Sequence, residues 1–217
     1  MKQRQPGLKL IRLGCDGETT ASFIKGGNCH YTNAGSQLDA AVKALAKHRG
    51  HVGYVTIDIG ANDILACADD KTGALDQNCV NRAARAIPEN LARITRALRK
   101  AGTPGVQYAG ATYYNPFLAE WLRGAAGQQA AERSTGLVDS ENAAMSQVYA
   151  AAGFKVADVA DAFSSEDVNP VSLPGYGEVP TNVARICQLT WACTRQDPHA
   201  NPLGHKVIAD AFASGLS

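Results

Sequence analysis

Residues 52–63 run Val52-Gly53-Tyr54-Val55-Thr56-Ile57-Asp58-Ile59-Gly60-Ala61-Asn62-Asp63 and give the strongest indication of the fold. The apolar part of this stretch is short and is closed by glycine and polar residues, which is typical of a strand buried on both faces of a parallel sheet. In open α/β sheets, ligands bind beyond the carboxyl ends of the strands. The Asn62 amide is therefore a candidate hydrogen-bond donor to a developing oxyanion. Gly, Asn and Asp are also ordinary turn residues, and the tetrapeptide alone favours a turn and a site equally.

Apolar segments alternate with helical patterns along the rest of the chain. Strands are expected at residues 8–13, 52–59, 106–113 and 154–159. A helix is expected from Ser36 to near Gly50, and a short helix is expected to end at about Ala86. Further helices are expected from Pro88 to near Gly102, at about 117–131 and 137–152, and from Pro202 to Ala213. Residues 164–198, rich in proline and glycine, are expected to form a long loop. The alternation of strands and helices predicts an α/β domain with a mostly parallel sheet.

The composition limits the function classes. With 217 residues, 45% of them hydrophobic and 19% charged, the chain is long enough for one globular domain with a full core. The formal net charge of +1 gives no reason to expect nucleic acid or an anionic membrane as a partner. No apolar run reaches the roughly eighteen residues that a membrane span needs. One group of basic residues is interpreted as a solvated helix face: Arg82, Arg85, Arg93, Arg96, Arg99 and Lys100.

Six cysteines indicate the compartment. They are Cys15, Cys29, Cys67, Cys79, Cys187 and Cys193, and neighbours within successive pairs lie 14, 12 and 6 positions apart. This spacing favours three local disulfides and an oxidising, extracytoplasmic location, although other connectivities are open and free thiols are the alternative. No C-x-x-C pattern occurs. No apolar segment of signal-peptide length follows the N-terminal residues, so no export signal is expected in this chain.

Most catalytic signatures are missing. The chain has no G-x-S-x-G nucleophile elbow, P-loop, G-x-G-x-x-G or H-E-x-x-H pattern, and we expect neither a cofactor nor a metal. The segment Asp197-Pro198-His199-Ala200-Asn201-Pro202-Leu203-Gly204-His205 is different, because it brings a carboxylate within two residues of an imidazole. An Asp that accepts from one ring nitrogen leaves the other free as a general base. The segment is also a good helix start, with Asn201 as N-cap and Pro202 after it.

With these segments in place, the chain resembles the SGNH, or GDSL, family of serine ester hydrolases, in which four blocks converge on one site. The glycine of the second block is similar to Gly17 in Leu13-Gly14-Cys15-Asp16-Gly17-Glu18-Thr19-Thr20. The third block, Gly-x-Asn-Asp, matches residues 60–63, and the fifth block resembles residues 197–205. The resemblance covers essentially the whole chain and looks closest to the secreted, disulfide-bearing bacterial members.

The resemblance implies a three-layer α/β/α, flavodoxin-like fold and an activity. The Gly17 N–H and the Asn62 side chain would be oxyanion donors, His199 would be the base and Asp197 its orienting partner. The substrate would be a small-molecule or lipid ester, as for a carboxylesterase or a lipase. The family usually has two residues between its Asp and His, whereas only Pro198 stands between them here. A backbone carbonyl is therefore an alternative partner for His199.

The first block of the family, Gly-Asp-Ser, is not found in this sequence. The resemblance then implies an N-terminally shortened form, a single domain over residues 1–217 that lacks the first strand and its nucleophilic serine. That strand would lie between those at 8–13 and 52–59. We therefore expect a homo-oligomer formed through unpaired strand edges, or direct pairing of these two strands. The alternative to an ester hydrolase is an inactive fragment, or a relative that binds an acyl or carbohydrate ligand.

Overall fold

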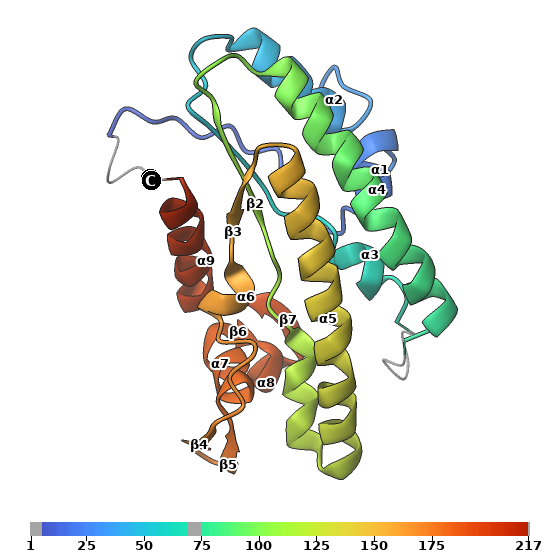
Figure 1. Cartoon of the computed structure of the whole chain (residues 1–217), viewed down its shortest axis with the longest axis vertical. Coiled ribbons are helices and arrows are strands. Elements are labelled where there is room, and N and C mark those ends of the chain that lie inside the picture. Colours follow the sequence, from blue (N-terminus) through green and yellow to red (C-terminus); the bar gives the residue numbers. More distant parts are fainter. Residues whose placement is uncertain (1–5, 69–74, 217) are drawn as a thin grey trace. The chain divides into compact units, whose positions relative to one another are not determined.

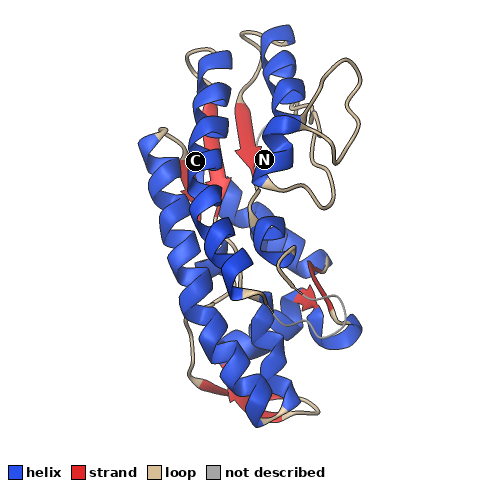
Figure 2. Cartoon of the chain, turned by 90° about the vertical axis from the view of Figure 1, so that its right-hand side faces the viewer, coloured by secondary structure: helices blue, strands red, loops and turns tan. Residues whose placement is uncertain are grey.

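A computed structural model of the chain describes residues 6–68 and 75–216. Its main sheet is parallel, with the strand order β1 (Tyr54–Ile57), β2 (Gln107–Ala111) and β3 (Lys155–Ala157). Helices form most of the remaining structure (Figure 1), and the strands are short by comparison (Figure 2). The predicted α/β class is therefore confirmed, and each of these strands lies inside a segment that the sequence marked as a strand.

The chain divides into two compact units. Unit 1 consists of Met1–Ala109 and Gln147–Lys155, and unit 2 of Gly110–Ser146 and Val156–Ser217. The boundaries fall within β2, within the long helix α5 (Ala125–Ala151) and within β3. Each unit has buried apolar side chains of its own. A single domain over the whole chain stays a prediction.

In unit 1, the helix α4 (Gln77–Ala101) contacts α1 (Thr20–Lys25), α2 (Gln37–Lys47) and α3 (Ala61–Leu65). Apolar side chains recur along α4 at helical spacing and form one buried face: Val80, Ile87, Leu91, Ile94 and Leu98. The predicted cap of α2 is present, because the Ser36 hydroxyl accepts a hydrogen bond of 3.1 Å from the Asp39 N–H. The sequence pattern thus explains both the burial and the start of these helices.

The helix α4 continues through Pro88, so the prediction of two helices separated before this residue was wrong. A proline inside a helix removes one backbone hydrogen bond and costs about 3 kcal/mol. Its neighbours Ile87 and Leu91 are completely buried, and burying such side chains stabilises by about 2 kcal/mol each. Breaking the helix would expose this face, so packing outweighs the local preference of proline.

Residues 8–13 form no strand, contrary to the prediction. Leu10 and Ile11 are 75% and 49% exposed. A strand needs a neighbour for its N–H and C=O groups, and no strand in residues 6–68 or 75–216 pairs with this segment. The expected direct pairing with the strand at 52–59 therefore does not occur. Homo-oligomer formation stays a prediction.

In unit 2, the helices predicted at about 117–131 and 137–152 have different bounds. A 3₁₀ helix, η1 (Pro116–Arg123), ends at Gly124, whose φ of +80° breaks the helical path. The helix α5 then runs without interruption past Gly136. A single glycine costs a helix only about 1 kcal/mol, and buried residues on both sides of it, such as Ala131 and Met145, keep the helix continuous.

Residues 164–198 do not form the predicted long loop. They contain an antiparallel hairpin of β4 (Pro170–Leu173) and β5 (Gly177–Pro180), followed by α7 (Thr181–Leu189) and the short α8 (Ala192–Arg195). Three side chains of α7 join the core of unit 2: Val183, Ile186 and Leu189. The prolines and glycines that suggested a loop lie at the hairpin turn and at the start of α7. The spacing of the apolar residues in α7 is helical and could have predicted this helix.

The final helix, α9 (Pro202–Gly215), begins as predicted. Asn201 caps it, because its Oδ1 accepts hydrogen bonds of 3.0 Å from the N–H groups of Leu203 and Gly204. The side-chain amide of Asn201 also donates to the Gln188 carbonyl at 2.8 Å. This cap therefore ties the start of α9 to the end of α7, next to the segment that carries Asp197 and His199.

All three predicted disulfides are confirmed: Cys15–Cys29, Cys67–Cys79 and Cys187–Cys193. Their Cα atoms lie 6.3, 5.5 and 5.1 Å apart, which suits disulfide geometry. Local cross-links of this kind stabilise mainly by restricting the unfolded chain. Within the two stretches that the structure describes, no helix combines the length and the apolar character that crossing a membrane requires.

Candidate active site

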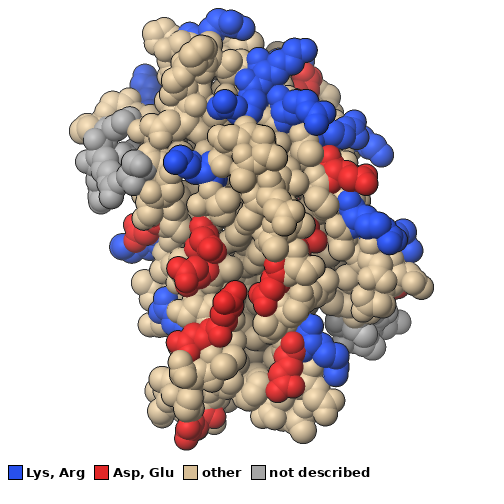
Figure 3. Space-filling model, in the orientation of Figure 1, with Lys and Arg blue, Asp and Glu red and all other residues tan. Residues whose placement is uncertain are grey.

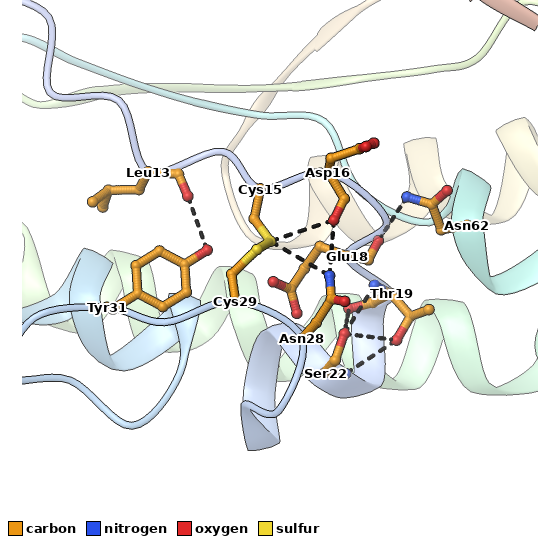
Figure 4. Close-up of a disulfide and its surroundings, with 10 residues drawn as sticks. All are labelled: Leu13, Cys15, Asp16, Glu18, Thr19, Ser22, Asn28, Cys29, Tyr31 and Asn62. Atoms are coloured by element: carbon orange, nitrogen blue, oxygen red, sulfur yellow. Dashed lines mark hydrogen bonds between the residues drawn. A yellow bond between two sulfur atoms is a disulfide. The ribbon is translucent and has the colours of Figure 1, made fainter.

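Asn62 follows the carboxyl end of β1. Gly60 joins the strand to α3 with a φ of +130°, a conformation that L side chains rarely adopt. Asn62 therefore lies in the first turn of α3, and its Nδ2 donates a hydrogen bond of 3.0 Å to the Glu18 carbonyl (Figure 4). An amide nitrogen carries two N–H groups, so one remains for a ligand.

Gly17 precedes this carbonyl in a tight turn, in the left-handed region at φ +69°. Its N–H donates no hydrogen bond to another residue of the described chain. The Cys15–Cys29 disulfide closes the loop around the turn, and the Asn28 amide donates to the Asp16 carbonyl at 2.9 Å (Figure 4). Gly17 directly precedes Glu18, whose carbonyl Asn62 binds, so both donors belong to the same turn region. A backbone N–H and a side-chain amide are both groups that can stabilise oxyanions.

Asp63 fixes this arrangement from the other side. Its two carboxylate oxygens accept hydrogen bonds from Thr20, one from the backbone N–H at 2.8 Å and one from the hydroxyl at 2.6 Å. Asn90 of α4 donates to the same hydroxyl at 3.1 Å. Burial raises the pKa of the Asp63 carboxyl above its ordinary value of 3.8, and the bonds from Thr20 partly oppose this rise. Asn62 and Asp63 together hold both ends of the Glu18–Thr20 segment.

The Glu18 side chain is 2% exposed, and neither of its carboxylate oxygens has a hydrogen-bond partner among the described residues. It points toward the Cys15–Cys29 disulfide (Figure 4). Donor atoms of Cys15, Glu18 and Cys29 lie within 4.8 Å of one another, a spacing that would suit a metal ion. The two sulfurs are bonded to each other, however, and a disulfide offers no thiolate ligand. This cluster is therefore not a metal site in its oxidised form.

Asp197 and His199 lie on β7 (Asp197–Ala200), which pairs antiparallel with β6 (Thr190–Trp191) in unit 2. The Asp197 Oδ1 lies 2.5 Å from the His199 Nδ1 and accepts a second hydrogen bond, of 3.0 Å, from the His199 backbone N–H. A carboxylate, and not a backbone carbonyl, is thus the partner of Nδ1. The His199 side chain is 69% exposed. Its Nε2 is therefore accessible to take a proton from an attacking group.

The pKa of the Asp197 carboxyl lies below its ordinary value of 3.8. The larger cause is the hydrogen bond from the His199 backbone N–H, and the next is the hydrogen bond from the His199 side chain. In a carbon-detected NMR titration, we expect Asp197 to titrate below this value. Because the pKa is lower in the folded state, the hydrogen bonds to the Asp197 carboxylate stabilise the fold at pH values above the ordinary pKa. This stabilisation is lost as the pH falls through the lowered pKa. In His199→Ala, the pKa should rise only part of the way, because the backbone N–H remains. A full return to the ordinary value would contradict the backbone contribution.

Tyr114 holds the peptide between Asp197 and His199. Its hydroxyl donates a hydrogen bond of 2.8 Å to the Pro198 carbonyl. Its ring stacks on Phe163, with centroids 4.4 Å apart and planes 9° from parallel, and Phe163 is completely buried. The exposed Asp–His pair is thereby connected to the core of unit 2.

The structure brings the four predicted site residues into two groups. In unit 1, Gly17 precedes Glu18 and Asn62 binds the Glu18 carbonyl, and in unit 2 Asp197 contacts His199. Two further residues, Asp63 and Tyr114, hold the segments that carry these groups and were not predicted from the sequence. The acidic last position of Gly-x-Asn-Asp was a usable signal for Asp63. No local pattern marks Tyr114, because its partner lies 84 positions away.

A protein-family model for the GDSL-like lipase/acylhydrolase family matches residues 2–207. The matched region includes the Gly17 turn, Asn62 and the Asp197–His199 pair. No curated protein and no solved structure matches the chain.

Proposed function

Because the chain belongs to the GDSL-like lipase/acylhydrolase family, we propose that it hydrolyses carboxylic esters of lipids or small acyl compounds. Membership of this family supports hydrolase activity of the esterase type in general. The substrate class and the roles of individual residues go beyond family membership and are what we propose. The observation that carries it is the contact between the Asp197 carboxylate and Nδ1 of an exposed His199, which leaves Nε2 free to act as a base.

In the proposed reaction, His199 Nε2 takes a proton from the attacking oxygen as that oxygen bonds to the ester carbonyl carbon. The electron pair of the C=O bond moves to the carbonyl oxygen, which accepts hydrogen bonds from the Gly17 N–H and the Asn62 amide. Asp197 stabilises the imidazolium through Nδ1. When the tetrahedral intermediate collapses, the alkoxide leaves and takes the proton back from His199.

The source of the attacking oxygen is the part of the proposal that differs most from an ordinary serine hydrolase. No serine in the 217 residues stands in a Gly-Asp-Ser context. We therefore assign the attack by this chain to a water molecule that His199 activates. An oxyanion hole and substrate binding without the serine still accelerate hydrolysis by roughly 10³–10⁴-fold over water. Turnover of activated esters is accordingly expected to be slow but measurable.

A fluorophosphonate probe tests this assignment, because it labels serine nucleophiles covalently. We expect mass spectrometry to find no adduct on the chain, under conditions that fully label a conventional serine esterase. Slow hydrolysis of p-nitrophenyl acetate should accompany this result and should depend on His199. An adduct on a serine would identify another nucleophile and contradict attack by water. Absence of any turnover, together with binding of a fatty acid, would favour the alternative of an acyl-binding relative.

Tyr114→Phe is expected to lower kcat about 5- to 10-fold with little change in KM, because one hydrogen bond of about 1 kcal/mol that positions the Asp197–His199 segment is lost. The ring stacking on Phe163 is retained in this variant, so the fold should persist. Tyr176→Phe is the matched control, since Tyr176 is an exposed tyrosine on the hairpin. An increase in KM alone would indicate that Tyr114 contacts substrate and would contradict a positioning role.

We also propose an extracytoplasmic location. The three disulfides are consistent with an extracellular protein, because such bonds persist in oxidising compartments. Non-reducing peptide mapping of protein isolated from its native compartment tests this. Six free thiols in that material would contradict it.

A further inference from the structure

The net charge of +1 conceals a strong separation of charge along the chain. Unit 1 contains 16 Lys and Arg against 9 Asp and Glu, a formal net charge of +7. Unit 2 contains 5 Lys and Arg against 11 Asp and Glu, a formal net charge of −6. An anionic surface would therefore interact very differently with the two units, which the net charge of the whole chain does not reveal.

The positive charge of unit 1 is concentrated on the outer face of α4. Five exposed basic side chains recur at helical spacing along this face, and we call them the α4 basic stripe: Arg82, Arg85, Arg93, Arg96 and Lys100. Its ends, Arg82 and Lys100, are 18 positions apart, so the stripe is about 27 Å long at 1.5 Å per residue. Figure 3 shows Lys and Arg following α4 along the upper right of the view.

The α4 basic stripe has no carboxylate partner in residues 6–68 and 75–216. Among the described residues, none of its members forms a salt bridge, whereas Lys43, Arg123 and Lys206 each pair with a carboxylate. Glu89 is the one acidic residue between Arg85 and Arg93 on this face. The opposite face of α4 is buried in the core of unit 1, so the orientation of the stripe is fixed by packing.

We propose that the α4 basic stripe docks the protein onto an anionic lipid surface. A continuous helix that carries its cations on one exposed face can bring them to a surface together. Each cation near an anionic membrane strengthens binding by about fivefold. The helix α4 contains no aromatic residue. Sites for single-stranded nucleic acids commonly use aromatic side chains on which the bases stack. Docking at a lipid surface would concentrate the protein where lipid esters are found, but the inference does not depend on the proposed activity.

Vesicle co-sedimentation of the whole chain tests the inference. We expect binding to vesicles of phosphatidylcholine mixed with phosphatidylglycerol, and none to phosphatidylcholine alone. Binding should weaken strongly between 0.1 M and 1 M salt, as the screening length falls from about 10 Å to about 3 Å. The triple variant Arg85→Glu/Arg93→Glu/Arg96→Glu should bind the mixed vesicles at least about 100-fold more weakly, because it removes three cations and adds three anions.

The matched control is Arg123→Glu/Arg133→Glu/Lys206→Glu, which reverses three exposed cations of unit 2. It changes the net charge by the same amount as the triple variant of the α4 basic stripe. It should retain vesicle binding. If the first triple variant does not fold, the Arg→Gln substitutions at the same positions replace it and should still weaken binding. Equal losses in both sets of variants, or binding that salt does not weaken, would overturn the inference. So would binding to duplex DNA without binding to the mixed vesicles at the same salt concentration. Failure of the esterase proposal would leave these results unchanged, because no turnover is measured.

Discussion

His199→Ala is expected to hydrolyse p-nitrophenyl acetate about 10²-fold more slowly than the unaltered chain, at the lower end of what a positioned base contributes. In the proposed reaction Nε2 takes the proton. Removing the imidazole also leaves Asp197 with only the backbone N–H of residue 199 as a hydrogen-bond donor. The reduction should appear in kcat, measured by steady-state kinetics at neutral pH, with KM almost unchanged.

His205→Ala is the matched control, because His205 is an exposed histidine on the adjoining helix α9. It should retain the turnover of the unaltered chain. Equal rates for His199→Ala and the unaltered chain would remove His199 from the chemistry, and with it the role given to Asp197.

Asn62→Ala is expected to lower kcat by about 10²–10³-fold, the usual effect of losing one oxyanion donor. The Asn62 amide also donates to the Glu18 carbonyl, so part of any loss could come from a displaced turn. Asn28→Ala separates the two effects, because Asn28 donates to the Asp16 carbonyl in the same turn but has no assigned role in the reaction. We expect Asn28→Ala to lower kcat by less than about tenfold, as the loss of one ordinary hydrogen bond predicts.

Similar losses in Asn62→Ala and Asn28→Ala would show that Asn62 acts only by holding the turn. Thermal unfolding of both variants provides a second comparison. Asn62→Ala loses a partly buried hydrogen bond to a backbone carbonyl, whereas Asn28→Ala loses exposed ones, so the melting temperature should fall further in Asn62→Ala.

The sequence was sufficient for features that depend on local pattern. The apolar run before Gly60 predicted β1, and Asn201 followed by Pro202 predicted the start of α9. The cysteine spacing favoured the disulfides that the structure contains. The close succession of Asp197 and His199 also indicated a pair, and the structure places them in contact. In each case the interacting residues are near one another in the chain.

Features that depend on distant contacts could not be predicted in this way. Pro88 suggested a helix boundary, but the buried side chains on either side of it keep α4 continuous. Residues 8–13 have the composition of a strand, but no strand of the described part of the chain pairs with them. The bond from Tyr114 to the Pro198 carbonyl and the bonds from Thr20 to Asp63 join segments that only the fold brings together.

The proposed reaction requires the Gly17 N–H, the Asn62 amide and His199 to act on the same ester, and an NMR titration with a short-chain alkylphosphonate tests this requirement most directly. This compound mimics the tetrahedral oxyanion and needs no nucleophile for binding. We predict that the Gly17 amide, the Asn62 side-chain amide and the His199 ring resonances shift together, with a single Kd, and that Asn62→Ala weakens binding for all remaining reporters. Shifts confined to one of these groups, or separate Kd values for Asn62 and His199, would contradict the account.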